Sequence, residues 1–126
     1  MDILLMNENV LLREIEKEFT KKLIDRFEPW IEKVILFGSR AKGVAKPWSD
    51  YDILIVLNKR DSKIIDEVYE IVTDFQLEHR VDISLKIYRK DDFEMKNALH
   101  TPFMEQIKKT GVVLWSRQQQ NLSKAR

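Results

Sequence analysis

Two short apolar runs, separated by a polar loop, constrain the fold of this chain more than any other feature. The first, residues 34–37, is continuously apolar and rich in β-branched side chains, which is typical of a strand buried on both faces. The second run, residues 51–57, is introduced by Asp50 and carries Asp52 near its start. The pattern predicts two strands, with a loop that joins the end of one to the beginning of the other.

Gly38 and Ser39 follow the first predicted strand directly. A glycine at this point lets the backbone turn sharply and approach a ligand closely. Ser39 can offer its hydroxyl and cap a helical turn through Ala41 and Lys42, and the free amides at the start of such a turn suit a phosphate. The sequence therefore predicts a phosphate-binding turn here.

The rest of the loop offers further candidates. Arg40 and Lys42 could contact phosphates or be solvated helix residues, and Arg40 is the better candidate because it is adjacent to the Gly-Ser pair. Trp48 lies in the loop at 44–49, where an aromatic ring could stack on a base or acceptor, or could anchor the loop to the body. Both alternatives stay open for Trp48.

Asp50 and Asp52 point to a metal. Side chains alternate along a strand, so these two carboxylates face the same way, with their Cα atoms about 7 Å apart. Like charges so placed repel, and a divalent cation between them removes the repulsion. Oxygen ligands in a chain without cysteine favour Mg²⁺ or Mn²⁺ over Zn²⁺.

A third carboxylate, Asp82, introduces a later strand. In residues 81–88 apolar residues alternate with Asp82, Ser84 and Lys86, which indicates a strand with one face in the core and one polar face. If this strand lies beside the strand of Asp52, the three carboxylates converge, and Asp82 becomes the candidate third ligand that completes a two-metal site with Asp50 and Asp52. The carboxylate not needed for the metal could then act as a general base.

Two other stretches predict amphipathic helices. Apolar residues recur at helical spacing within residues 7–28, and Pro29 ends the pattern. Residues 62–78 show the same periodicity and lead the chain to the strand of Asp82. A strand, a helix and a strand in this order predict a crossover connection. The predicted fold class is α/β, with a mixed sheet, helices packed against it and a single small domain.

The C-terminal part is less regular. A short helix is predicted at 103–109 and a last strand at 112–115. Residues 116–126 are polar, with no apolar periodicity, and are expected to be a mobile, disordered tail. The predicted domain therefore spans residues 1–115.

Composition excludes several functions. The chain has 126 residues, which allows one core, and its 22 basic and 21 acidic residues give a net charge of +1. Nothing in this balance predicts a broad nucleic-acid or membrane surface. No signal peptide or membrane-spanning run is present and cysteine is absent, so we expect a soluble, cytoplasmic protein.

Gly38-Ser39, ten intervening residues, Asp50-Tyr51-Asp52 and a later lone Asp82 resemble the DNA polymerase β-like nucleotidyltransferase superfamily. The short chain is similar to its minimal nucleotidyltransferase (MNT) branch, and the resemblance covers about residues 30–115. It implies a nucleotidyltransferase fold in which Ser39 holds the triphosphate of ATP or another NTP. By the same resemblance, Asp50 and Asp52 hold two Mg²⁺ ions, and Asp82 activates the acceptor hydroxyl for attack on the α-phosphate.

The resemblance also implies a partner. Larger relatives carry an acceptor-binding domain for which this chain has no room, and the minimal branch suggests a small helical HEPN-type protein, often a toxin ribonuclease. An antitoxin of this kind transfers AMP from ATP to a tyrosine of that toxin. The alternative is a non-catalytic module that neutralises its partner by binding, and a homo-oligomer is also possible.

Other interpretations of the central stretch are weaker. Gly38 and Gly43 match the two glycines of a P-loop, but Val44-Ala45 stands where Lys-Ser/Thr is required. Phosphatase sites place the Asp-x-Asp pair after an apolar strand, whereas here the apolar run follows it. The second acidic pair, Asp91-Asp92, is expected to begin a helix and not to bind a ligand.

Overall fold

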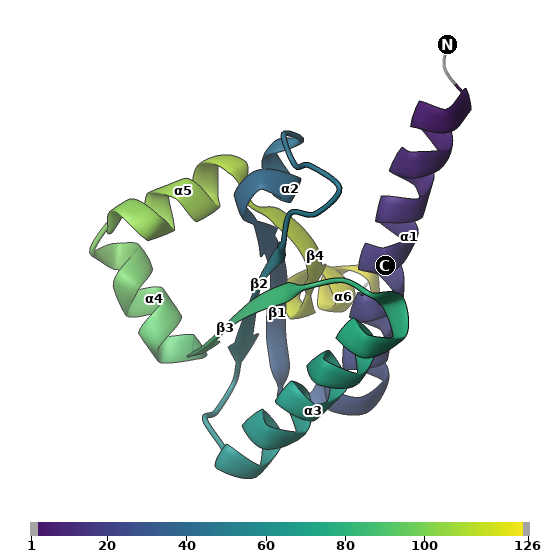
Figure 1. The fold of residues 1–126 in the computed structure, drawn as a ribbon. Coiled ribbons are helices and arrows are strands. Elements are labelled where there is room, and N and C mark those ends of the chain that lie inside the picture. The colour runs from purple at the N-terminus through teal and green to yellow at the C-terminus, as the bar shows by residue number, and fades with distance from the viewer. Residues whose placement is uncertain (1–2, 125–126) are drawn as a thin grey trace.

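The chain folds as an alternation of helices and strands (Figure 1). The computed structural model describes residues 3–124, and the side chains of residues 14–120. The elements are α1 (Ile3–Phe27), a 3₁₀ turn η1 (Glu28–Trp30), β1 (Ile31–Phe37), α2 (Gly38–Lys42), β2 (Tyr51–Leu57), α3 (Ser62–His79), β3 (Ile83–Arg89), α4 (Lys90–Ala98), α5 (Pro102–Thr110), β4 (Val112–Ser116) and α6 (Arg117–Lys124).

The strands form one mixed sheet in the order β3-β2-β1-β4. β1 runs antiparallel to β2 and to β4, whereas β2 and β3 are parallel and are joined through α3. A parallel pair needs such a crossover because a tight turn cannot return the chain to the same edge. The α/β fold class and the mixed sheet predicted from the sequence are confirmed.

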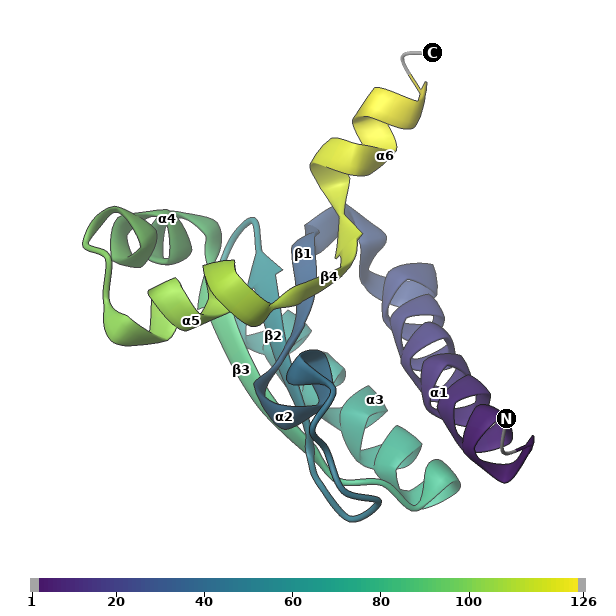
Figure 2. The same cartoon turned by 90° about the horizontal axis from the view of Figure 1, so that it is seen from above.

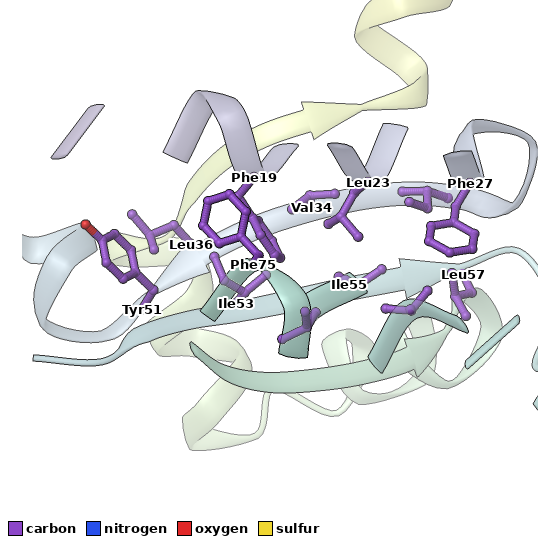
Figure 3. Close-up of a cluster of buried hydrophobic side chains, with 13 residues drawn as sticks. Phe19, Leu23, Phe27, Val34, Leu36, Tyr51, Ile53, Ile55, Leu57 and Phe75 are labelled. Atoms are coloured by element: carbon purple, nitrogen blue, oxygen red, sulfur yellow. The ribbon is translucent and has the colours of Figure 1, made fainter. Parts of the chain in front are cut away.

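Helices cover both faces of the sheet. α1 and α3 lie on one face, and α4 and α5 lie on the other (Figure 2). On the first face, Phe19, Leu23 and Phe27 of α1 pack on strand side chains (Figure 3). On the second face, a smaller cluster contains Ile35, Phe37, Leu54, Val56 and Ile107. The sheet therefore separates two apolar cores.

Local signals explain the helix boundaries. The side chain of Asp61 accepts hydrogen bonds from the amides of Lys63 and Ile64 and so caps α3. Thr101 caps α5 in the same manner by accepting from the amide of Met104. The predicted helices at 62–78 and 103–109 thus begin within one residue of their observed starts.

Three expectations were wrong in detail. The first helix begins at Ile3, not at residue 7. Ser39 lies inside α2, and Phe37 occupies the N-cap position without a side-chain hydrogen bond. The expected tail at 116–126 instead begins with Ser116, a buried residue of β4, and continues as helix α6 as far as Lys124. The last two residues of the expected tail lie outside the described part of the chain.

The described helices include none that is both long enough and apolar enough to cross a membrane.

Candidate active site

Gly38 lies against the carboxylate of Asp52. The register of β1 and β2 pairs Phe37 with Asp52, so the residue that follows β1 comes beside that aspartate. Gly38 has a φ of +75°, a conformation that side chains other than glycine's rarely adopt. A Cβ added to Gly38 would overlap Oδ2 of Asp52. The glycine therefore provides both the turn and the space for the carboxylate, whereas its predicted close approach to a ligand stays a prediction.

Asp50 and Asp52 interact electrostatically. Burial raises the pKa of the Asp52 carboxyl, the negative charge of Asp50 raises it further, and the ammonium of Lys86 opposes both effects. Asp50 is exposed and Asp52 is half-buried. The charge of Asp52 is thus poorly compensated by the surrounding protein.

Asp82 lies one residue before β3, not within it. Its carbonyl oxygen accepts a hydrogen bond of 2.8 Å from the amide of Tyr51, and the parallel register pairs Tyr51 with Ile83. The backbone of Asp82 therefore lies beside the start of β2. However, the described residues contain no group of three acidic, histidine or cysteine side chains arranged to hold a metal, so the expected convergence of three carboxylates is not observed.

The loop after α2 is fastened by Arg40. Its guanidinium donates hydrogen bonds to the carbonyl oxygens of Ser49 and Pro47 and stacks on the ring of Tyr51. Nη1 of Arg40 donates to no group in the described part of the chain, so the predicted phosphate contact stays a prediction. Trp48 is 75% exposed, which excludes the alternative that it anchors the loop to the body.

Ser39 sits in α2 next to Gly38, half-buried. Its carbonyl accepts a hydrogen bond of 3.1 Å from the amide of Val44, which closes the helical turn. Among residues 14–120, whose side chains the structure describes, its hydroxyl has no hydrogen-bond partner. The hydroxyl is therefore available to a ligand.

Lys86 is a charged residue of this site for which no role was predicted from the sequence. It lies on β3 two residues beyond Ser84, which is the register partner of Asp52, and its charge lowers the pKa of Asp52. Its ammonium also lies 4.9 Å from the centroid of the Phe103 ring. The alternation of polar residues after Asp82 places Lys86 on the same polar face of the strand, and this pattern could have identified it as a candidate site residue.

Residues 17–120 match the family model described as polymerase beta, nucleotidyltransferase. The chain belongs to the polymerase β nucleotidyltransferase family. MJ0141 of Methanocaldococcus jannaschii, named as a candidate protein adenylyltransferase, is 31% identical to it over 100 residues, which cover 79% of this chain and 94% of MJ0141. The family and this relative identify the chain as a nucleotidyltransferase.

Solved structures share the fold of this nucleotidyltransferase. A crystal structure of a candidate nucleotidyltransferase from Sulfolobus solfataricus matches with a TM-score of 0.58 and 24% identity, covering 90% of this chain and 87% of that one. A chain from the structure of the tri-AMPylated HEPN toxin of Shewanella oneidensis in complex with MNT antitoxin matches with a TM-score of 0.51 and 18% identity, covering 87% and 76%. The nucleotidyltransferase fold expected from the sequence is thus confirmed.

Proposed function

We propose that this nucleotidyltransferase transfers AMP from ATP to a hydroxyl of a protein acceptor, namely a tyrosine of a HEPN-type helical protein, and acts as its antitoxin. The observation that carries the proposal is the contact of Gly38 with Asp52, beside Asp50, in a chain of this family. The relative MJ0141 supports a protein acceptor, and the complex from Shewanella oneidensis supports the HEPN class. We expect the reaction to occur in the cytoplasm.

Mg²⁺ fits the residues present. Asp50 and Asp52 supply carboxylate oxygens, which this hard cation prefers. The pKa of Asp52 is raised mainly by burial and, to a smaller extent, by the charge of Asp50, and a bound cation would offset both effects. We assign both carboxylates to Mg²⁺, with two ions as the family implies, and Mn²⁺ as a substitute. When bound, the metal would neutralise the charge of the triphosphate and polarise the α-phosphate.

The protein's own groups have separate tasks in this proposal. The hydroxyl of Ser39 donates a hydrogen bond to the triphosphate. The carboxylate of Asp82, whose backbone lies beside the start of β2 and whose side chain is exposed to an incoming acceptor, accepts the proton of the acceptor hydroxyl. The acceptor oxygen then bonds to the α-phosphorus, the bond from that phosphorus to the bridging oxygen breaks, and pyrophosphate leaves. AMP remains attached to the acceptor.

The test is the transfer of label from α-³²P-ATP, in the presence of Mg²⁺, to the product of the adjacent gene, offered as the acceptor protein. The Asp50→Asn/Asp52→Asn variant should lose the transfer. The Asp91→Asn/Asp92→Asn variant is the matched control, because it removes an equal charge from the first turn of α4 and should retain the transfer. EDTA should abolish the reaction of the native protein and of Asp91→Asn/Asp92→Asn.

Two outcomes would contradict the proposal. Transfer that survives in Asp50→Asn/Asp52→Asn would remove these carboxylates from the chemistry. An absence of transfer, together with tight complex formation by both the native protein and this variant, would favour a module that neutralises its partner by binding alone.

A further inference from the structure

Arg40 connects α2 to the residues around Asp50. Its Nε donates a hydrogen bond of 3.0 Å to the carbonyl oxygen of Ser49, and its Nη2 donates bonds of 2.7 Å to the same oxygen and 3.2 Å to that of Pro47. A weaker bond of 3.4 Å reaches the carbonyl of Lys46. One guanidinium thus gathers three carbonyl groups of a loop that follows it by six to nine residues.

The same guanidinium stacks on Tyr51. Its Cζ lies 4.0 Å from the centroid of this ring, and Tyr51 is only 3% exposed. A cation at this distance from an aromatic face is attracted to it, and more strongly where water is excluded. Since Ser49 precedes Asp50 and Tyr51 follows it, Arg40 holds the residues on both sides of this aspartate.

The sheet fixes Asp50 from one side only, through Tyr51, whose amide bonds to the carbonyl of Asp82. β2 begins at Tyr51, so Asp50 lies outside the strand, and its side chain is exposed. The turn that precedes it is closed by two local bonds, from the amide of Ser49 to the carbonyl of Lys46 and from the amide of Lys46 to the hydroxyl of Ser49. Neither bond connects that turn to the body of the protein, whereas the contacts of Arg40 do.

We infer that Arg40 is a positioning residue that fixes the place of Asp50 relative to Asp52 and thereby sets the affinity of this carboxylate pair for a divalent cation. The inference rests on the proposed function, since it concerns the metal that the transfer requires. Lysine cannot replace Arg40 in this task, because an ammonium lacks both the planar surface that stacks on Tyr51 and the fork that reaches two carbonyls together.

The experiment measures Mn²⁺ binding by electron paramagnetic resonance and amide hydrogen exchange at residues 49–51. Arg40→Lys keeps the charge, and we expect it to bind Mn²⁺ about 10-fold more weakly, the loss typical of residues that support metal ligands. Exchange at these amides should be faster than in the native protein. Tyr51→Phe keeps the ring and should retain native binding.

Arg26→Ala is the matched control. Arg26 also lies over an aromatic ring, with its Cζ 5.5 Å from the centroid of Phe27, but it is on α1 and away from the carboxylates. Its removal should leave Mn²⁺ binding and the exchange at 49–51 unchanged. If Arg26→Ala lowers the stability but the protein stays folded at the assay temperature, unchanged Mn²⁺ binding in this variant would show that lower stability alone does not weaken binding.

The outcomes separate the inference from the proposed function. Native Mn²⁺ affinity in Arg40→Lys, with binding lost in Asp50→Asn/Asp52→Asn, would overturn the positioning role and leave the proposed function intact. An absence of Mn²⁺ binding by the native protein would overturn both. Weaker binding in Arg40→Lys and native binding in Arg26→Ala would establish the role.

Discussion

At the scale of single residues, two glycines with the same backbone conformation have different surroundings. Gly38 and Gly43 both have a φ of +75°, but a Cβ on Gly43 would meet nothing within 4 Å, whereas a Cβ on Gly38 would overlap the Asp52 carboxylate. The conformational cost of alanine at positive φ is therefore common to both positions. Only the displacement of Asp52 is specific to Gly38.

This comparison gives the first prediction. Gly38→Ala and Gly43→Ala should each lower the free energy of unfolding by about 1 kcal/mol or more, because alanine tolerates this φ poorly. Gly38→Ala alone should reduce AMP transfer by about 100-fold, since a carboxylate displaced by an ångström no longer orients the reactants. Denaturant titration and the labelling assay measure the two effects. Equal transfer by the two variants would contradict a role for the Gly38–Asp52 contact.

The second prediction concerns pH. Burial first, and the charge of Asp50 second, raise the pKa of Asp52 above its ordinary value of 3.8. The folded protein therefore binds this proton more tightly than the unfolded chain, and the resulting stabilisation is present below pH 3.8 and is lost as the pH rises through the raised pKa. Asp52→Asn cannot ionise, so its free energy of unfolding relative to the native protein should increase between pH 3.8 and neutrality.

Unfolding in EDTA as a function of pH tests this expectation without interference from divalent ions. In an Asp50→Asn background the pH dependence should be smaller, because one of the two causes of the raised pKa is absent. A stability difference between Asp52→Asn and the native protein that stays constant over this range would contradict the prediction.

At the scale of elements, α6 is attached to the sheet by the side chain of Arg117 rather than by a row of apolar side chains. The guanidinium of Arg117 donates to the carbonyl oxygens of Glu28 and Ile31, at the start of β1, and lies 3.4 Å from a carboxylate oxygen of Glu28 and of Glu32. Charge-assisted bonds to half-buried groups are stronger than exposed ion pairs. The first turn of α6 is therefore fixed to the sheet by one side chain.

The third prediction follows from this anchor. Arg117→Ala should lower the free energy of unfolding by about 1–3 kcal/mol, because the half-buried carbonyls of Glu28 and Ile31 lose a charged donor. Arg89→Ala removes an arginine whose ion pair with Asp91 is exposed, and should cost only about 0.5 kcal/mol. Thermal and chemical unfolding of the two variants give the comparison. Similar losses in both would show that the contacts of Arg117 contribute nothing beyond a surface ion pair.

The elements also show what the sequence could and could not predict. Strands 34–37 and 51–57 were predictable because burial on both faces leaves a continuous apolar run, and the parallel pairing followed from the intervening helix. The approach of Gly38 to Asp52 follows from the register of those strands. By contrast, the hydrogen bonds of Arg40 depend on the conformation of the loop at 44–49. The spacing of residues along the sequence does not predict this conformation. Helix α6 has no apolar periodicity, so neither the helix nor its contact with the sheet through Arg117 could be predicted from the sequence.

At the scale of the whole molecule, the candidate site belongs to one face of the sheet. Side chains alternate along β2, so Asp52 is on the same face as Leu54 and Val56, which form the smaller core beneath α4 and α5. The larger core between the sheet and the helices α1 and α3 lies on the opposite face. The geometry of the carboxylates should therefore depend on the packing of the smaller core.

Phe75 and Phe103 provide a matched pair for the last prediction. Phe75 of α3 is buried in the larger core, where its ring meets that of Phe19 edge to face at 5.2 Å. Phe103 of α5 meets the ring of Phe37 edge to face at 5.3 Å, and Phe37 is the register partner of Asp52. Phe103 also lies under the ammonium of Lys86, which acts electrostatically on Asp52.

Replacement of each phenylalanine by leucine should therefore separate stability from function. Phe75→Leu should cost about 1 kcal/mol of stability through the loss of buried contacts, yet leave Mn²⁺ affinity unchanged at temperatures where the protein is folded. Phe103→Leu should destabilise the protein less, because this residue is only half-buried, but should weaken Mn²⁺ binding several-fold. Equal Mn²⁺ affinity in the two variants would mean that the carboxylates do not depend on the smaller core, and that β2 and the loop after α2 suffice to place them.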